Sequence, residues 1–239
     1  EELDLFTEIK EGNDILNNKH ANTTIPKFLG AVNHYMATGE PFYLEAAESF
    51  FKIVEKHHTY ITGGNSEWEH FGLPGILDKE RTNCNCETCN THNMLKLAER
   101  LYQITGKKQY MDYYENTIIN AILASQNPET GMSMYFQPMA TGYFKVFSRP
   151  YEDFWCCTGT GMENFTKLQE GIYYKDREEE NKIYINQYIS SKLVFSNKKG
   201  ADFILIQQTD MPVSDKVYFQ VCTRQNKKGT KVTLCFRLP

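Results

Sequence analysis

Two short cysteine-rich stretches carry the strongest chemical signal in the sequence. They are residues 84–89, which read CNCETC, and residues 155–161, which read WCCTGTG, and each runs into a predicted helix. Four soft or borderline ligands from two separate loops make the usual arrangement of a zinc site. A thiolate near a helix N-terminus is stabilised by the helix dipole, and a nearby metal lowers its pKa further. The spacing therefore indicates a metal site, without deciding between a structural and a catalytic one.

Cysteine pairing offers the main alternatives to a metal. The chain has seven cysteines, an odd number, so they cannot all form disulfides. Adjacent cysteines rarely bridge each other without strain, and a disulfide-stapled mini-protein is shorter and spreads its cysteines more evenly. A disulfide within or between the two stretches and simple burial of the thiols both stay open at this point. Cys222 and Cys235 fall in predicted strands, where we expect them to serve packing.

A glycine-rich loop upstream adds groups suited to sugar chemistry. Residues 62–72 read TGGNSEWEHFG, which is too rich in glycine for a helix and does not alternate like a strand. Glu67 and Glu69 supply two carboxylates, Trp68 an indole that can stack on a ring, and His70 an imidazole that can hydrogen-bond. A partly desolvated glutamate can hold a proton at neutral pH and so act as an acid. The alternative is an exposed polar loop.

Composition excludes several classes of protein. With 239 residues, 41% of them hydrophobic, the chain can bury a sizeable core, so wholesale disorder is excluded. The formal net charge of −4 shows no basic excess, so we expect no nucleic-acid partner. No apolar run approaches the roughly 20 residues of a membrane helix, so we expect no membrane partner. The first residues show no signal-peptide core, and the compartment stays open.

The reactive stretches lie among predicted helices that form an internal repeat. Apolar residues at helical spacing predict helices over residues 25–38, 41–57, 89–105 and 108–125. The string Tyr-x-x-Thr-Gly ends the first of these at Gly39 and the third at Gly106, where glycine suits the left-handed position after a helix. Stacked helical hairpins of this kind predict an α-solenoid or an α/α toroid.

The second cysteine stretch leads into a further predicted helix. Thr160 and Glu163 fit a capping box, in which the side chains of the two residues bond each other's backbone N–H groups. This pattern places the start of the helix about three residues after the adjacent cysteines.

Residues from 182 onward change to the alternating pattern of β-strands. The predicted strands span residues 182–187, 192–195, 202–208, 216–222 and 231–237. The chain up to about Tyr174 reads as mostly helical. The charged run 175–181, KDREEEN, is read as a solvated hairpin or linker. We therefore predict an α + β multidomain protein, with a helical domain over residues 1–175 and a β domain over residues 176–239.

Four strings taken together resemble those of a known enzyme family. They are HANT with IPK at residues 20–27, TGG with EHFG within residues 62–72, ETCNTHNMLK at residues 87–96, and CCTGTG at residues 156–161. The combination covers nearly the whole chain and resembles the β-L-arabinofuranosidases of glycoside hydrolase family 127 and its sister family 146. The resemblance implies part of an (α/α)6-barrel catalytic domain followed by the start of a β-sandwich. It also implies a retaining glycosidase that acts on L-arabinose-containing oligosaccharides or glycans.

The resemblance further implies a metal site and two catalytic residues. The residues that would hold one Zn²⁺ ion are Glu87, Cys89, Cys156 and Cys157. Cys156 would also be the nucleophile, and Glu69 the general acid/base. Cys84 and Cys86 match no ligand of the family, and their role stays open.

Substrate contacts are expected from both the resemblance and the loop. The residues expected to contact the sugar are His20, Trp68, His70 and Tyr135. Glu69 is preferred to Glu67 as the acid/base because Phe71 completes a Glu-x-Phe pattern of the family.

The family architecture also bears on how much of a protein this chain represents. In that architecture the chain lacks the N-terminal barrel helices and much of the sandwich, so we expect it to be the middle of a longer protein. Apolar helix faces left uncovered would favour self-association, and the isolated chain could be inactive. Two alternatives stay open: a relative that binds carbohydrate without cleaving it, and a helical scaffold whose zinc is purely structural.

Overall fold

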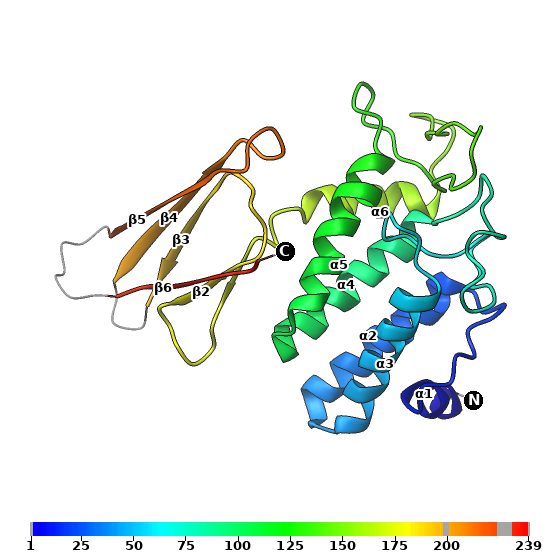
Figure 1. Cartoon of the computed structure of the whole chain (residues 1–239), viewed down its shortest axis with the longest axis horizontal. Coiled ribbons are helices and arrows are strands. Elements are labelled where there is room, and N and C mark those ends of the chain that lie inside the picture. Colours follow the sequence, from blue (N-terminus) through cyan, green and yellow to red (C-terminus); the bar gives the residue numbers. More distant parts are fainter. Residues whose placement is uncertain (1, 198–200, 224–230, 239) are drawn as a thin grey trace. The chain divides into compact units, whose positions relative to one another are not determined.

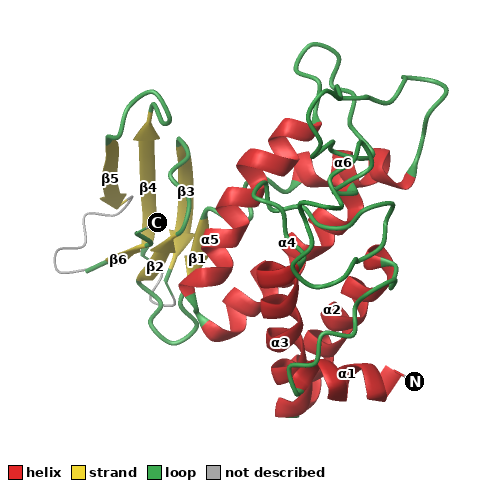
Figure 2. Ribbon diagram, turned by 45° about the vertical axis from the view of Figure 1, so that its right-hand side comes forward, coloured by secondary structure: helices red, strands yellow, loops and turns green. Residues whose placement is uncertain are grey.

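The computed structural model describes residues 2–197, 201–223 and 231–238. The chain divides into two compact units, Glu1–Thr166 and Lys167–Pro239. The first unit is helical with long loops, and the second consists of short strands, as Figure 2 shows by colour. The fold is therefore mixed helix and sheet, as the sequence predicts.

Two helical hairpins form the framework of the first unit (Figure 1). Its α-helices are α1 (Glu2–Lys10), α2 (Ala21–Thr38), α3 (Pro41–His57), α4 (Thr88–Thr105), α5 (Lys108–Thr117) and α6 (Cys156–Thr166). A π-helical turn (Ile118–Ile122) and a 3-10 turn (Leu123–Ser125) continue directly from α5. The predicted helical run over residues 108–125 is thus helical throughout, but its last two turns leave α geometry.

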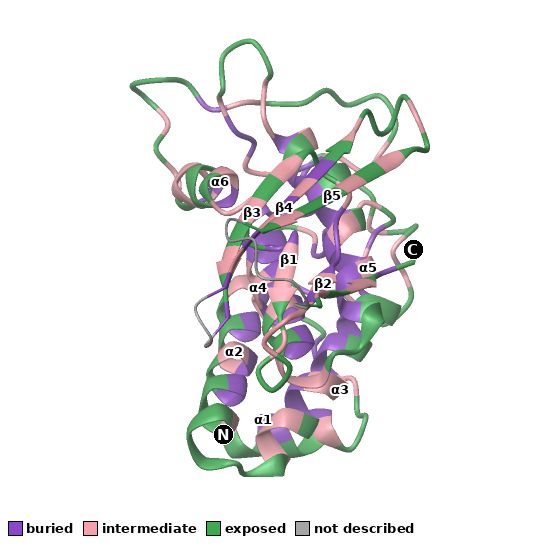
Figure 3. Cartoon of the chain, turned by 90° about the vertical axis from the view of Figure 1, so that its left-hand side faces the viewer, coloured by how far each residue is buried: buried purple, intermediate pink, exposed green. Residues whose placement is uncertain are grey.

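The two hairpins, α2–α3 and α4–α5, pack on each other through α2 and α4. Aromatic rings fill the contacts: Phe28 of α2 stacks on Phe50 of α3 at a centroid distance of 3.9 Å, and Phe51 meets Tyr110 of α5 edge-on at 4.9 Å. Figure 3 shows the buried residues as stripes along the helices. Burying one such phenylalanine ring stabilises a fold by about 1.5–3 kcal/mol, so this interior holds the first unit together.

The predicted glycine ends of the repeated helices are confirmed. Gly39 after α2 has φ 77° and Gly106 after α4 has φ 65°, both in the left-handed region that glycine adopts without a Cβ penalty. The N–H of each glycine donates to a tyrosine carbonyl, Tyr35 or Tyr102, at 2.8 Å. Both hairpins therefore turn by the same device.

Two predicted helix starts are wrong. Helix α2 begins at Ala21 and not at residue 25, because the hydroxyls of Thr23 and Thr24 donate to the carbonyl of His20 and support an earlier first turn. Helix α6 begins at Cys156 and not three residues after the cysteines. The capping box is wrong because the Thr160 hydroxyl contacts the sulfur of a distant cysteine, as described below.

The chain up to Tyr174 is mostly helical, as expected, but it also contains long irregular stretches. Residues 126–155 form a long irregular segment that is fixed by isolated β-bridges and by bonds to other loops. Turns occupy residues 167–172, and a short strand, β1 (Tyr173–Lys175), follows. Local periodicity missed β1 because its three residues are too few to alternate.

In the second unit, the residues that the structure describes form two three-stranded sheets. The remaining strands are β2 (Lys182–Ile185), β3 (Ser191–Ser196), β4 (Asp202–Thr209), β5 (Val217–Thr223) and β6 (Thr233–Phe236). Their orders are β1-β2-β6 and β3-β4-β5, and Ile183, Ile185 and Leu205 form the buried centre. All five predicted strands exist with bounds shifted by one or two residues, and β5 and β6 carry Cys222 and Cys235 as predicted. The charged run joins antiparallel β1 and β2, which confirms the hairpin.

Among the described residues, none of the helices combines the length and the apolar character needed to cross a bilayer.

Candidate active site

Three segments of the first unit meet around the start of α4. Residues 82–88 lie between the loop 62–72 and the segment 133–139. On one side the N–H of Thr88 donates to the carbonyl of Tyr135 at 2.9 Å. On the other side, residues 82–88 form backbone hydrogen bonds and a β-bridge with the loop 62–72. The irregular course of all three segments is thus fixed by contacts between them, which brings polar side chains from distant parts of the sequence together.

The four predicted metal ligands converge. Glu87, Cys89, Cys156 and Cys157 offer ligand atoms that all lie within 4.8 Å of one another. The sulfurs of Cys89 and Cys157 are 3.2 Å apart, and Oε1 of Glu87 is 3.7 Å from the Cys157 sulfur and 3.9 Å from the Cys156 sulfur. All seven cysteines are free thiols, so the disulfide alternatives are not realised.

The donor set fits a metal ion. Glu87 is 1% exposed, and within the described residues its Oε2 atom has no hydrogen-bond partner. A buried carboxylate oxygen without a partner costs free energy unless a cation or a proton compensates it. One carboxylate and three thiols is a set that zinc accepts. The cluster could therefore hold a metal ion, and it is compatible with Zn²⁺.

Protonation in the cluster follows burial and mutual contact. Burial, together with the neighbouring Cys89, raises the pKa of Glu87 to about 8. The hydrogen bond from Cys157 lowers the pKa of Cys89 to about 6, and the same contact raises the pKa of Cys157. Desolvation raises the pKa of Cys156. Without a cation Cys89 is thus the thiol of this cluster that ionises most readily, and a bound cation would be needed to hold Cys156 and Cys157 as thiolates.

Tyr135 connects the predicted acid/base with the predicted nucleophile. Its hydroxyl donates a short hydrogen bond to Oε1 of Glu69 and lies 3.7 Å from the Cys156 sulfur. On the other side of the carboxyl group, Nε2 of His20 lies 3.5 Å from Oε2 of Glu69. Cys156 is exposed, whereas the other three cluster residues are buried. The accessible thiol and the carboxyl group thus share one hydroxyl between them.

A strained turn presents Glu69. The backbone N–H and carbonyl groups of Glu67 and His70 bond each other at 3.0 Å, so Trp68 and Glu69 are the two central residues of a tight turn. Their φ angles are 44° and 68°, a left-handed geometry that normally takes Asn and Gly. Two residues with bulky side chains at such positions cost stability, and strain of this kind clusters at functional sites. The turn therefore serves to place the Glu69 carboxyl group.

The other glutamate of the loop points elsewhere. Oε1 of Glu67 accepts a hydrogen bond from the hydroxyl of Thr82 at 3.2 Å. Glu69 is the glutamate that reaches Tyr135 and His20. The geometry thus separates two carboxylates that sequence pattern alone distinguished only through a neighbouring phenylalanine.

The remaining two predicted substrate residues lie at the rim of the site. Trp68 is 61% exposed, and its ring lies edge-on to Phe136 at 5.9 Å. His70 is exposed, with Nδ1 2.7 Å from the Trp68 carbonyl and its ring 5.1 Å from the ring of His20. Both side chains are available to a ligand that approaches Glu69.

A buried polar contact that the sequence did not indicate joins the two helices that carry the cysteines. Nδ1 of His92 on α4 lies 2.7 Å from Oδ1 of Asn164 on α6. The hydroxyl of Thr160 on α6 lies 3.1 Å from the Cys89 sulfur on α4. The order in the string CNTH gives no hint of these partners, because both lie about 70 positions further along the chain.

Cys84 and Cys86 lie outside the four-residue cluster. Both are buried, and Cys86 takes φ 51°. A Cβ atom on Gly64 would come within 2.7 Å of the Cys86 side chain, so a glycine at position 64 is needed for Cys86 to pack there. These two thiols therefore contribute to packing, which is the role that the sequence left open.

Comparison with protein families identifies the chain. The description of the first matching family is Beta-L-arabinofuranosidase, GH127 catalytic domain, over residues 2–170, and that of the second is the GH127 middle domain over residues 182–239. The chain belongs to the GH127 β-L-arabinofuranosidase family. Comparison with curated proteins gives no match to this GH127 chain.

Solved structures of GH127 proteins share the fold. A GH127 beta-arabinofuranosidase aligns with a TM-score of 0.78 and 22% identity over 94% of this chain and 34% of its own length. A GH127 beta-L-arabinofuranosidase from Geobacillus stearothermophilus T6 aligns with a TM-score of 0.73 and 16% identity, over 90% of this chain and 35% of its own length. A structure described as a glycoside hydrolase aligns with a TM-score of 0.77 and 20% identity, over 95% of this chain and 41% of its own length. This GH127 chain thus spans between a third and two fifths of the length of the structures it matches.

Proposed function

We propose that the protein is a retaining glycoside hydrolase that releases β-L-arabinofuranose from arabinose-containing glycans. Cys156 is the nucleophile and Glu69 the general acid/base. The observation that carries the proposal is the Tyr135 hydroxyl, which contacts both the Cys156 sulfur and the Glu69 carboxyl group. Retaining glycosidases place their two reactive groups close together, and a hydroxyl that contacts both groups keeps them near each other.

A zinc ion completes the site in this proposal. Glu87, Cys89, Cys156 and Cys157 would hold it, which supplies the buried Glu87 carboxylate with its missing partner. When bound, Zn²⁺ favours the thiolate form of its cysteine ligands at neutral pH. Of the three cysteines only Cys156 is exposed, so it is the sulfur that a substrate can reach.

The reaction then follows from the positions of the side chains. The Cys156 thiolate attacks the anomeric carbon while Glu69 gives its proton to the departing oxygen, and the carbon–oxygen bond breaks as the carbon–sulfur bond forms. Glu69, now a carboxylate, takes a proton from water. The water oxygen bonds to the anomeric carbon and displaces the sulfur, which regenerates the Cys156 thiolate and the protonated Glu69. The products are arabinose and the alcohol of the leaving group.

Neighbouring residues position the sugar and the acid. His20 and Tyr135 each contact the Glu69 carboxyl group and present polar atoms to a sugar that is bound against it. Trp68 and His70 stand at the rim, where an indole can cover the C–H face of a ring. Because the Tyr135 hydroxyl donates to Glu69, it orients the carboxyl group relative to the sulfur.

The family membership supports a proposal for the larger architecture. Residues 1–175 would be part of an (α/α)6-barrel catalytic domain, and residues 176–239 part of a β-sandwich domain. Apolar side chains exposed on the first unit, among them Ile119, Leu123 and Met162, would be covered in such a barrel. A chain limited to these 239 residues would expose them and self-associate, which light scattering can measure.

The test uses the full-length protein with aryl and alkyl β-L-arabinofuranosides. Cys156→Ser is expected to reduce turnover at least about a thousandfold even in the fraction of the enzyme that still holds its metal, and Cys222→Ser in β5 is the matched control with normal activity. Glu69→Gln is expected to slow alkyl glycosides far more than 4-nitrophenyl glycosides, because a good leaving group needs little protonation. Full activity of Cys156→Ser would refute the nucleophile, and equal losses for both glycosides would refute the acid role. Glu67→Gln is the control for the carboxylate.

A further inference from the structure

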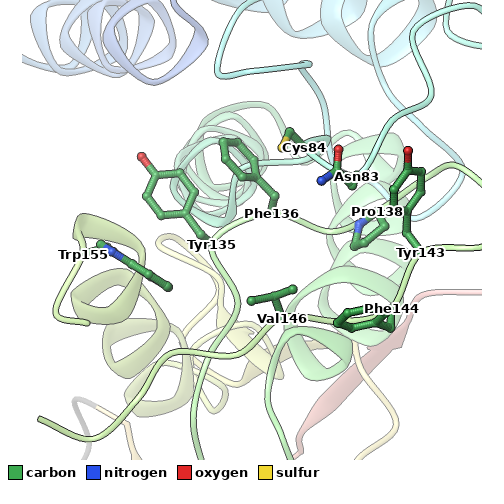
Figure 4. Close-up of a pocket in the computed structure, with 9 residues that line it drawn as sticks. All are labelled: Asn83, Cys84, Tyr135, Phe136, Pro138, Tyr143, Phe144, Val146 and Trp155. Atoms are coloured by element: carbon green, nitrogen blue, oxygen red, sulfur yellow. The ribbon is translucent and has the colours of Figure 1, made fainter. Parts of the chain in front are cut away.

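A pocket lined by aromatic side chains lies beside the candidate active site (Figure 4). Its volume is about 370 Å³, and the residues that line it are Asn83, Cys84, Tyr135, Phe136, Pro138, Tyr143, Phe144, Val146 and Trp155. The labelled rings surround an open space in the figure. None of these nine residues, all within the described part of the chain, is charged. A volume of this size can take a single aromatic or sugar ring.

The pocket shares residues with the reactive groups. The ring of Tyr135 forms part of its wall, and the hydroxyl of the same residue contacts Glu69 and Cys156. Trp155, another wall residue, directly precedes Cys156 and lies 5.7 Å from the Tyr135 ring. A molecule in the pocket is therefore adjacent to the atoms that make and break bonds.

The pocket also extends toward the acid. Phe136 in its wall meets the ring of Trp68, the residue before Glu69 in the strained turn. The backbone N–H of Trp68 donates to the carbonyl of Cys84, a further lining residue, at 2.9 Å. Since a general acid protonates the departing oxygen, the part of the substrate on the acid side is the leaving group.

We propose that this pocket binds the leaving group of the substrate and prefers a group with a flat apolar face. An aromatic ring and the C–H face of a sugar both have such a face, and both stack on aromatic side chains. Charged leaving groups are disfavoured because the lining offers them no ion partner. This inference rests on the proposed glycosidase function, which assigns the acid role to Glu69.

Phe144 offers a test that spares the fold, because it is 79% exposed. Phe154 is a matched control on the same irregular segment, since it is also a phenylalanine, is 75% exposed and does not line the pocket. Phe144→Ala and Phe154→Ala are compared in the full-length protein. Substrates are methyl, phenyl and 2-naphthyl β-L-arabinofuranosides and an arabinose disaccharide.

For Phe144→Ala we expect kcat/KM to fall about tenfold for the 2-naphthyl glycoside and less than about twofold for the methyl glycoside, because a lost ring–ring contact weakens binding by roughly that factor. Phe154→Ala should leave both unchanged. If Phe144→Ala also lowers kcat/KM for the disaccharide, a sugar is a natural leaving group. If it lowers kcat/KM for the aryl glycosides alone, the natural leaving group is aromatic. Equal effects of Phe144→Ala on methyl and naphthyl glycosides would overturn the proposal.

A binding measurement separates this proposal from the proposed function. Calorimetry with 2-naphthol alone should show weaker binding to Phe144→Ala than to the wild type or Phe154→Ala. If this holds but no arabinofuranoside is hydrolysed, the proposed function fails and the pocket stands. If hydrolysis occurs but 2-naphthol does not bind, the pocket assignment fails. A lower Tm of Phe144→Ala with unchanged selectivity would mean that another segment of the longer protein covers the pocket, which also overturns the proposal.

Discussion

The two helical hairpins of the first unit are alike at one end and different at the other. Gly39 and Gly106 are 67 residues apart, end their helices in the same left-handed conformation and donate to the equivalent tyrosine carbonyl. The preceding threonines, Thr38 and Thr105, also make the same two hydrogen bonds with their own helix and the following turn. This end of the repeat serves only to turn the chain.

The opposite ends carry the candidate chemistry. His20 and Glu87 are also 67 residues apart and stand directly before the first residues of α2 and α4. Neither side chain caps its helix; His20 faces Glu69, and Glu87 belongs to the four-residue cluster. Repetition therefore explains how residues far apart in the sequence converge, because equivalent helix starts lie at the same end of neighbouring hairpins.

The buried faces of α2 and α4 differ in polarity, and the more polar face is that of α4, which leads into the four-residue cluster. The buried residues of the first two turns of α2 are mostly apolar, with Ile25 and Phe28 fully buried. The corresponding turns of α4 bury polar side chains, which are Thr88, Asn90, Thr91 and His92. A polar interior costs stability unless each group finds a partner, so α4 gives up packing for site geometry.

The largest expected contrast is between the two residues at the helix starts. Glu87→Ala should remove the proposed zinc ion and reduce activity at least about a thousandfold, because the cluster loses its only carboxylate ligand. His20→Ala should keep the metal and reduce kcat/KM by about 10–100-fold, which corresponds to one lost hydrogen bond to a charged group. Metal analysis by mass spectrometry and aryl glycoside kinetics measure both. Equal metal loss in the two variants would contradict the division of roles.

His92 gives the next largest contrast, because its equivalent in the first hairpin is Ile25. His92→Ile removes the partner of Asn164 and loosens α6 from α4, so we expect metal affinity to fall by about 10–100-fold. Competition with a zinc chelator measures the affinity. Ile25→Val is the control, since it should lower Tm slightly and leave metal affinity unchanged.

Sequence reasoning succeeded where local rules decide the structure. The predicted helix over residues 41–57 has the observed bounds of α3, because apolar spacing and a proline in the first turn both mark it. Residues 126–155 could not be predicted, because their course depends on distant partners such as the bond from Thr88 to Tyr135. The resemblance led us to expect the four clustered residues, yet only the structure with its strained turn shows which of Glu67 and Glu69 reaches Tyr135 and His20. Sequence rules could not predict this turn, because its central residues are Trp68 and Glu69 whereas such turns normally contain Asn and Gly.

A smaller and equal effect is expected at the shared ends of the hairpins. Gly39→Ala and Gly106→Ala each place a Cβ in the left-handed region, which costs about 1–2 kcal/mol, although no heavy atom lies within 4 Å of either position. Each should lower Tm by about 2–8 °C without changing metal content. Gly30→Ala in the middle of α2 is the control and should be neutral or stabilising. Metal loss in Gly106→Ala alone would show that the turn end is coupled to the site.

The smallest expected contrast concerns how the free energy of unfolding changes at acidic pH. It follows from the residues at the end of the second helix of each hairpin, His58 and Ser125. His58 after α3 is 3% exposed, and burial lowers its pKa below 6.5 even though Asp14, with Oδ2 2.8 Å from Nε2, acts in the opposite direction. The native state therefore favours the neutral imidazole, whereas the unfolded chain takes up a proton near pH 6.5. Below that pH the unfolded state binds more protons, so the free energy of unfolding should fall as the pH drops.

The second hairpin has no titratable group at the equivalent position, which is Ser125. His58→Gln should therefore flatten the decline in stability between about pH 5 and 7, whereas Ser125→Ala should lower stability by the same amount at every pH. Urea unfolding followed by tryptophan fluorescence measures this, because both tryptophans, Trp68 and Trp155, lie in the first unit. If wild-type stability instead rises toward pH 5, the Asp14 contact outweighs burial in setting the pKa of His58. His58 would then not make the first hairpin sensitive to acid.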